Sequence, residues 1–119
     1  MMVERIPIEL RDDGIAIVSP EGELDLSTAE ALRERLKEAI SVASVGVIVD
    51  LSRVNFMDSV TLGVLLGGMK KAKDKGIEFV LASPSEHDRR VISMVHLDSV
   101  FKLCDELEEA IKLMLSSRG

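Results

Sequence analysis

The chain has no tryptophan and no tyrosine, and three of its 119 residues are phenylalanines: Phe56, Phe79 and Phe101. Bases of single-stranded nucleic acids stack on aromatic side chains, so this scarcity argues against a surface that binds them. The formal net charge of −6 at pH 7 also lacks the basic excess of a nucleic-acid footprint. We therefore expect protein partners and no nucleic acid, and an aliphatic core around the three phenylalanines.

Cysteine is nearly absent too, because Cys104 stands alone and excludes an internal disulfide. Neither a signal peptide nor an apolar run long enough to span a membrane is evident. We expect no membrane association, a cytoplasmic localisation, and Cys104 as a small buried hydrophobic residue. His87 and His96 have no second His or Cys at ligand spacing, so neither a metal site nor a cofactor is predicted.

The length of 119 residues suits one domain, and no linker-like segment divides it. We predict a single domain over residues 1–119 that buries about two-thirds of its unfolded surface. Such a domain needs no metal or disulfide to fold, and we expect it to be a monomer when free.

The segment 45–76 organises the chain. Val45 to Leu51 is a nearly continuous apolar run rich in β-branched residues, typical of a central strand covered on both faces. A helix is predicted to follow, capped by Asp58, beginning within about two residues of Ser59 and ended by Gly76. A helix N-terminus favours phosphate through its free N–H groups and its dipole. From these residues alone, simple capping by Asp58 and Ser59 remains an alternative to a phosphate site.

Strands and helices are predicted to alternate around this segment. An Asp-Gly pair at Gly14 joins residues 6–10 and 15–18 into a hairpin, and a third short strand is expected at residues 23–24. Later strands are expected at 77–82 and 100–103. Three further helices are each expected to begin at a polar cap: Ser27, Ser83 and Asp105. The pattern predicts an α/β fold with a mixed, mostly parallel sheet, an N-terminal antiparallel hairpin and about four packed helices.

Glycines inside the predicted helix need an explanation, since each costs about 1 kcal/mol relative to alanine. Gly63 and Gly67 lie four residues apart and share one helical face. That face would allow close approach of the sheet, of a neighbouring helix or of a docked partner. Packing within the molecule is the simpler of these interpretations.

Three segments resemble the STAS domain of anti-sigma factor antagonists. Residues 56–67, FMDSVTLGVLLG, resemble the Phe-Met-Asp-Ser signature that enters a helix in this family. Residues 22–29 resemble the Gly-Glu-Leu-Asp segment before the family's first helix, and residues 100–110 resemble its last strand and helix. Where many members have a small residue and glycine after the serine, this chain has Val60 and Thr61.

The resemblance implies reversible protein binding rather than catalysis. The unphosphorylated chain would bind an anti-sigma factor that is also a serine kinase, and thereby release a sigma factor. Phosphorylation of Ser59 would break this complex, and a serine phosphatase would restore it. The implied partner-binding residues are Asp25, Asp58, Ser59, Val60, Thr61 and Gly63. Because turns that leave neighbouring strands collect at one end of such a sheet, we expect Asp25 within roughly 15 Å of Ser59, about three strand spacings.

Three hydroxyl groups are candidates for the phosphorylated position. Thr61, at about the third helical residue, is expected to point toward Asp58 and to be hard to reach. Ser99 lies in a repeat of the Asp-Ser-Val triplet that precedes a strand, so we interpret it as a turn residue. Ser59 alone combines the family motif with an exposed place on the first helical turn.

Alternative functions stay open at this point. The chain could be a STAS module of a larger stress-signalling assembly. It could be a receiver-like phosphoaspartate protein using Asp50, although its acidic pair at 12–13 lies in a hairpin turn and no Lys-Pro pair follows a late strand. A hydrolase would need Ser59 with His87 or His96 as its base, but the Gly-x-Ser-x-Gly elbow is absent. We predict that the chain is not an enzyme.

Overall fold

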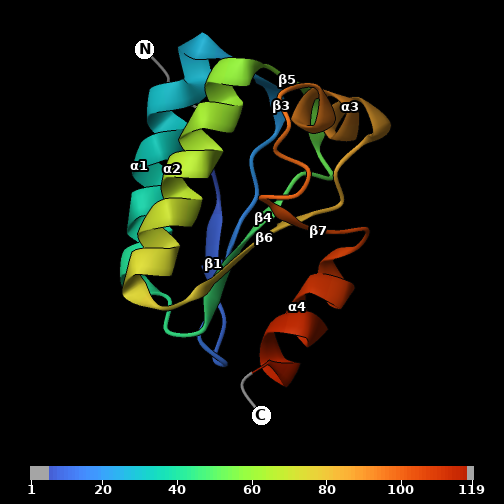
Figure 1. Ribbon diagram of the computed structural model, residues 1–119. Helices are drawn as coiled ribbons and strands as arrows, with labels where there is room; N and C mark the ends of the chain where they lie inside the picture. Colours follow the sequence, from blue (N-terminus) through green and yellow to red (C-terminus); the bar gives the residue numbers. More distant parts are fainter. Residues whose placement is uncertain (1–5, 118–119) are drawn as a thin grey trace.

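The computed structural model describes residues 6–117, and the remaining residues of the predicted domain, 1–5 and 118–119, lie outside this part. Strands and helices alternate, with α1 and α2 side by side on one face of the sheet and α4 on the other (Figure 1). In chain order the elements are β1 (Ile8–Leu10), β2 (Ile15–Val18), β3 (Gly22–Leu24), α1 (Leu26–Val42), β4 (Gly46–Asp50), β5 (Val54–Met57), α2 (Ser59–Lys75), β6 (Glu78–Ala82), α3 (Glu86–Met94), β7 (Lys102–Cys104) and α4 (Leu107–Ser116).

The main sheet has the strand order β1-β2-β4-β6-β7. β1 and β2 are antiparallel and the other neighbours are parallel, which confirms the predicted α/β fold class and its opening hairpin. β4 is the central strand, as predicted. Pro7 directly precedes the edge strand β1, where a residue without an N–H donor is tolerated.

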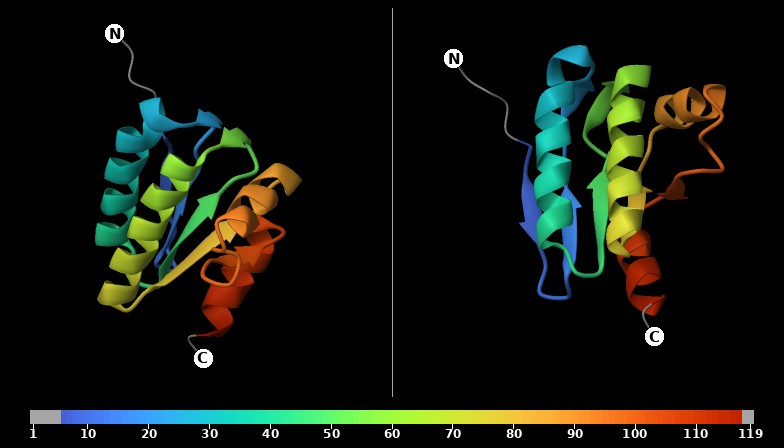
Figure 2. Two further views of the ribbon diagram at one scale, coloured as in Figure 1. Left: turned by 45° about the horizontal axis from the view of Figure 1, so that its top comes forward. Right: turned by 60° about the vertical axis from the view of Figure 1, so that its left-hand side comes forward.

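The middle of β4 is apolar because helices cover both faces of this strand (Figure 2). Val47 and Val49 belong to the cluster beneath α1 and α2, whereas Ile48 belongs to the cluster beneath α4. Alternate residues of a strand point to opposite faces, so a strand covered on both faces needs apolar residues at every position. All three side chains are 0% exposed.

A second, two-stranded sheet was not predicted. β3, expected as a third short strand, pairs in parallel with β5, a strand that the sequence pattern did not indicate. Its four residues do not alternate, since Val54 and Met57 are buried and the two between them are exposed. Phe56 is 40% exposed, so the prediction that it belongs to the core was wrong. Its ring stacks on His87 of α3 with the centroids 5.5 Å apart.

Three predicted helix caps were wrong by one or two residues. Asp25, not Ser27, caps α1, because its side chain accepts from the Ser27 N–H and Thr28 Oγ1 accepts from the Asp25 N–H. Ser85, not Ser83, caps α3 through the Asp88 N–H. Ser83 has a φ of 57°, so the chain is still turning there. The N-cap of α4 is Glu106 without a side-chain bond, and Asp105 lies before it. The last strand also begins later than predicted, at Lys102.

Lys75 joins the C-terminal ends of α1 and α2. Its Nζ donates to the carbonyl oxygens of Ile40 at 2.6 Å, Ser41 at 3.1 Å and Ala43 at 2.9 Å. The last carbonyls of a helix lack partners within it, and the last turn of α1 has no basic residue of its own. The final turn of α2 therefore completes the end of α1. None of the helices among residues 6–117 combines the length and apolarity needed to cross a membrane.

Candidate functional site

The N-termini of α1 and α2 lie together at one end of the molecule. Leu24 is in register with Met57, and the Asp58 N–H donates to the Leu24 carbonyl at 3.2 Å. The next residues of the two strands, Asp25 and Asp58, are the N-caps of the two helices. Since paired strands lie about 4.8 Å apart, both caps belong to one site, and this register agrees with the expected closeness of Asp25 and Ser59. Both helices start at the top of Figure 1.

Asp58 caps α2 as predicted. Its Oδ1 accepts from the Thr61 N–H at 2.9 Å and from the Thr61 hydroxyl at 3.0 Å. The Thr61 side chain is 0% exposed, which confirms that its hydroxyl points toward the cap and is out of reach. Thr61 therefore completes the cap, and α2 ends as predicted at Gly76 with a φ of 84°.

Ser59 is the first residue of α2 and is exposed. The carboxylate before it is occupied by Thr61, and within the described residues the Ser59 hydroxyl has no hydrogen-bond partner. The positive ends of two helix dipoles meet here, because α1 begins beside α2. An anion attached to the Ser59 oxygen would thus lie in a favourable field without displacing any bond of the fold.

Asp25 brings a fixed negative charge to the site. Its Oδ1 accepts from the Ser27 hydroxyl at 2.6 Å and from the Ser27 N–H at 2.9 Å. The hydroxyl bond, followed by the backbone bonds, holds the pKa of Asp25 below its ordinary value. Asp25 is therefore ionised at neutral pH and can pair with a basic group of a partner.

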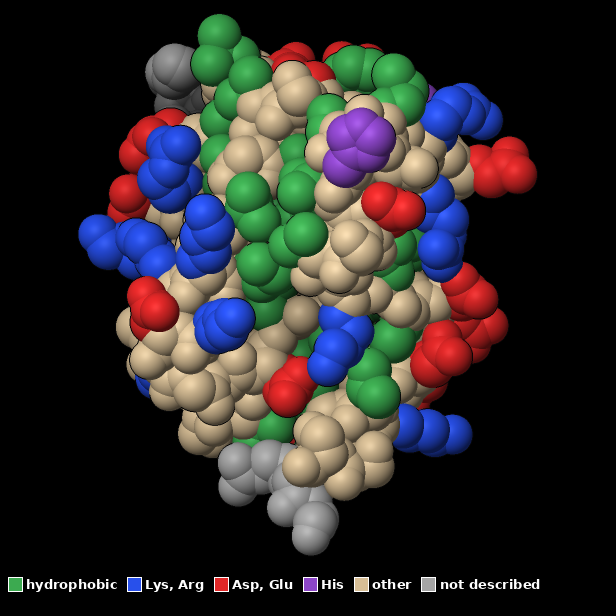
Figure 3. All heavy atoms as spheres, in the orientation of Figure 1, with side chains coloured by type: hydrophobic (Ala, Val, Ile, Leu, Met, Phe, Trp, Pro, Cys, Tyr) green, Lys and Arg blue, Asp and Glu red, His purple; other side chains and the backbone are tan. Residues whose placement is uncertain are grey.

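Three exposed apolar side chains surround these polar groups. Leu26 at the start of α1 is 74% exposed, Val60 at the start of α2 is 41% exposed, and Phe56 on β5 is 40% exposed. Hydrophobic side chains are visible at the top of the face in Figure 3. The buried centre of a protein interface is more apolar than the rest of a protein surface, so these three side chains suit such a centre. Sequence reasoning missed Leu26 and Phe56, although an apolar residue directly after a helix cap, off the buried face, is a signal for Leu26.

The glycines of α2 divide into two kinds. A Cβ on Gly68 would lie 3.1 Å from Leu36 Cδ1, so Gly68 allows α2 to pack on α1. A Cβ on Gly63 or Gly67 would meet no atom within 4 Å. Packing within the molecule, the simpler interpretation of Gly63 and Gly67, was therefore wrong.

The receiver-like arrangement around Asp50 does not form. Asp50 Oδ1 accepts from the Ser52 N–H at 3.1 Å and so stabilises the loop after β4. The acidic pair 12–13 precedes β2, which starts in register with Gly46 at the opposite end of β4. Phosphoryl transfer to Asp50 would have no acidic pair beside it. Among residues 6–117 no group of three or more His, Cys, Asp or Glu side chains could hold a metal ion.

Cys104 is buried, as predicted. Burial, followed by the charges of Glu109 and Asp105, raises the pKa of its thiol. The thiolate form is disfavoured, so Cys104 takes no part in the site.

Fold and site together define a small α/β domain with an exposed surface, partly apolar, around two helix N-termini. The STAS domain family matches residues 8–110. The chain therefore belongs to the STAS domain family of anti-sigma factor antagonists. These antagonists are regulatory proteins without catalytic activity, and the chain is accordingly not an enzyme.

Relatives cover most of the chain. The anti-sigma-F factor antagonist RsfB of Mycobacterium tuberculosis is 33% identical over 99 residues, which are 83% of this chain and 80% of RsfB. The crystal structure of an anti-sigma factor antagonist from Mycobacterium paratuberculosis has a TM-score of 0.83 at 30% identity, covering 92% of each chain. The Bacillus cell fate determinant SpoIIAA, solved in its phosphorylated form, has a TM-score of 0.70 at 28% identity, covering 90% of this chain and 96% of SpoIIAA.

Proposed function

We propose that the unphosphorylated chain binds an anti-sigma factor that is also a serine kinase, and thereby releases a sigma factor. Phosphorylation of Ser59 breaks the complex, and a serine phosphatase restores it. The surface that binds comprises Asp25, Asp58, Ser59, Val60 and Gly63, with Leu26 and Phe56 as apolar anchors. Thr61 acts through the Asp58 cap. Because the partner regulates transcription, the proposed compartment is the cytoplasm.

The observation that carries this proposal is the difference between two neighbouring hydroxyl groups. Ser59 is exposed and unbonded on the first turn of α2, whereas Thr61 is buried and bonded to Asp58. A kinase can reach only the first of them. The family relationship to SpoIIAA, a protein with a phosphorylated form, supports Ser59 as the modified position.

The switch acts on recognition rather than on the fold. A phosphate adds about −1.5 to −2 charges at pH 7, beside the carboxylates of Asp25 and Asp58. The two helix N-termini offset this charge within the free chain. In a complex the same charge lies under the partner, next to apolar anchors, where it is repelled or must be desolvated.

The test is phosphorylation by the partner kinase with ATP, followed by peptide mapping and measurement of binding. Ser59→Ala should abolish phosphorylation and keep binding. Ser59→Asp should weaken binding at least tenfold, about 1.4 kcal/mol. Ser99→Ala, a change of another exposed serine, is the matched control and should alter neither result.

Two results would contradict the proposal. Phosphate on Ser99 or Thr61 with Ser59 unmodified would place the switch elsewhere. A phosphoryl group that hydroxylamine cleaves would be an acyl phosphate on a carboxylate. Gel filtration of a native lysate adds one distinction, since elution of the chain in a very large complex would favour a module of a stress-signalling assembly.

A further inference from the structure

The groove between α1 and α2 is a second part of the binding surface. We propose that the partner which covers Ser59 also lays an acidic segment along this groove and inserts one apolar side chain into it. The inference rests on the proposed function, because it concerns the same partner. It assigns a role to Gly63 and Gly67, for which packing within the molecule was the simpler interpretation of the sequence.

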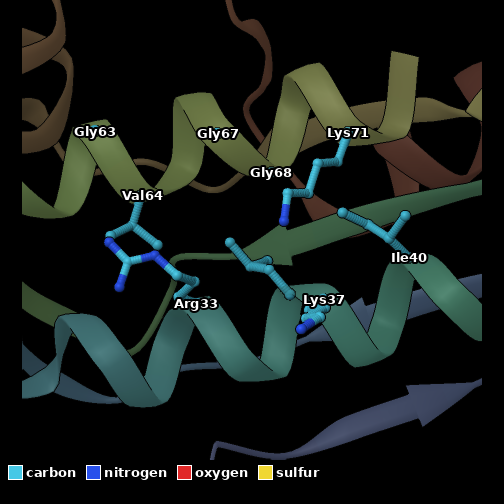
Figure 4. A pocket seen from close by; sticks show the side chains of 9 residues that line it. Arg33, Lys37, Ile40, Gly63, Val64, Gly67, Gly68 and Lys71 are labelled. Atoms are coloured by element: carbon cyan, nitrogen blue, oxygen red, sulfur yellow. The ribbon is translucent and has the colours of Figure 1, made fainter. Parts of the chain in front are cut away.

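The groove has an apolar floor and open glycines along one wall (Figure 4). Leu36 and Ile40 come from α1, and Val64 comes from α2. The hollow measures about 90 Å³, well above the ~10–15 Å³ that a single water needs. Pockets for drug-sized ligands measure about 300–1,000 Å³, so this hollow suits one side chain of a protein partner better than a small molecule.

Cationic side chains border this floor. Arg33 and Lys37 of α1 and Lys71 of α2 line the groove. Arg33 forms an exposed ion pair with Glu30, in which Arg33 Nη1 lies 2.5 Å from Glu30 Oε1. Within residues 6–117, Lys37 and Lys71 make neither an ion pair nor a side-chain hydrogen bond. Figure 3 shows Lys and Arg side chains gathered over α1 and α2. Because the whole chain carries a net charge of −6, this local excess of cations selects an acidic segment.

Gly63 and Gly67 keep the groove open. Neither glycine is in close contact within the molecule, since an added Cβ would find open space at both positions. Glycine lowers helix propensity, so two such residues without an internal contact point to an external one. Gly63 lies four residues after Ser59, about 6 Å along the helix axis at 1.5 Å per residue. A partner seated on Ser59 therefore reaches the groove without a break in its contact.

The first test reverses the charges of the groove. Binding of the anti-sigma factor kinase is measured by calorimetry for Lys37→Glu/Lys71→Glu at about 0.05 M and about 0.3 M salt, Debye lengths of roughly 14 and 6 Å. We expect at least tenfold weaker binding at low salt, and a smaller difference at high salt. Lys70→Glu/Lys112→Glu changes the net charge equally at exposed positions outside the groove lining, and should change affinity less than twofold.

The second test fills the groove without changing charge. Gly67→Leu should keep the thermal stability of the chain, because the leucine side chain enters open space. It should weaken binding of the anti-sigma factor kinase at least fivefold. Gly67→Ala should bind nearly as the wild type. A loss of stability in Gly67→Leu would show a purely structural glycine and would overturn the assigned role.

The outcomes separate this inference from the proposed function. If Ser59→Asp weakens binding while the charge-reversed and filled variants bind normally, the groove plays no part and the switch stands. If the wild type binds no anti-sigma factor kinase, both ideas fail together. Sedimentation velocity tests whether a second copy of the chain occupies the groove instead. If the wild type self-associates and Lys37→Glu/Lys71→Glu does not, the groove binds a second copy and the proposed occupant is wrong.

Discussion

At the scale of single residues, the site depends on two carboxylates whose positions are fixed by hydrogen bonds. Asp58 uses one oxygen for both the N–H and the hydroxyl of Thr61, and Asp25 does the same with Ser27. Each cap therefore fixes the direction of its helix and presents a negative charge at a known place. Thr61 strengthens this arrangement, because its hydroxyl adds a bond to the cap.

The acid dependence of stability tests the state of Asp25. Its pKa is lowered in the folded chain from the ordinary value of 3.8, chiefly by the Ser27 hydroxyl. A lowered pKa means that the ionised cap stabilises the fold fully above pH 3.8 and loses this effect as the pH falls through the folded value. Melting temperatures of the wild type and Asp25→Asn should therefore differ most near neutral pH and converge in acid. A difference that stays constant down to the acid end would show that the charge is irrelevant.

At the scale of elements, α2 and its C-cap contain glycines that differ in backbone conformation. Gly76 adopts a φ of 84° and ends the helix, a conformation that disfavours any side chain. Gly67 lies in the helix with open space where a Cβ would be. The same substitution should therefore have opposite effects at the two positions.

The prediction is that Gly76→Ala lowers the free energy of unfolding by about 1 kcal/mol, whereas Gly67→Ala raises it by up to about 1 kcal/mol. Denaturant titration of both variants measures the two changes. Gly68→Ala serves as an internal comparison, because its Cβ would lie 3.1 Å from Leu36 and should remove any gain. Stabilisation by Gly76→Ala would contradict the left-handed cap.

The elements also show which features the sequence could reveal. The central strand, the start of α2 and its end at Gly76 were predictable, because β-branched runs, Asp caps and C′ glycines leave local signals. β5 was not, since its burial arises from pairing with β3 some 30 residues earlier and leaves no alternation. The predicted caps of α1 and α3 were wrong because several Ser and Asp residues lie close together before each helix. The position at which the preceding strand or turn ends decides which of them is the cap.

At the scale of the whole molecule, one strand holds two cores together. β4 contacts the cluster beneath α1 and α2 through Val47 and Val49, and the α4 cluster through Ile48. Opening of either core must disturb it, while the edge strands β1 and β7 each have one neighbour. Local stability should therefore fall from the centre of the sheet to its edges.

Native-state hydrogen exchange should find the amides of Ile48 and Val49 among the slowest and those of β1 among the fastest in strands. Exchange in β4 should occur only through global unfolding, with a free energy equal to that from denaturant titration. Fast exchange of Ile48 and Val49 would be incompatible with this architecture. The same measurement on Ser59→Asp should give the same values in β4, because the proposed switch would change recognition and leave the fold intact.

The three hydrogen bonds from Lys75 make the two ends of the helix pair different. They pin α1 and α2 together at their C-terminal ends, whereas the opposite ends, which carry Ser59 and the entrance to the groove, are held by packing and by the short β3-β5 sheet. The distance between the two helices is therefore fixed most firmly at their C-terminal ends, and any change in this distance is largest at their N-terminal ends. In the proposed complex, a partner seated on Ser59 therefore meets the end of the helix pair that the Lys75 bonds do not hold.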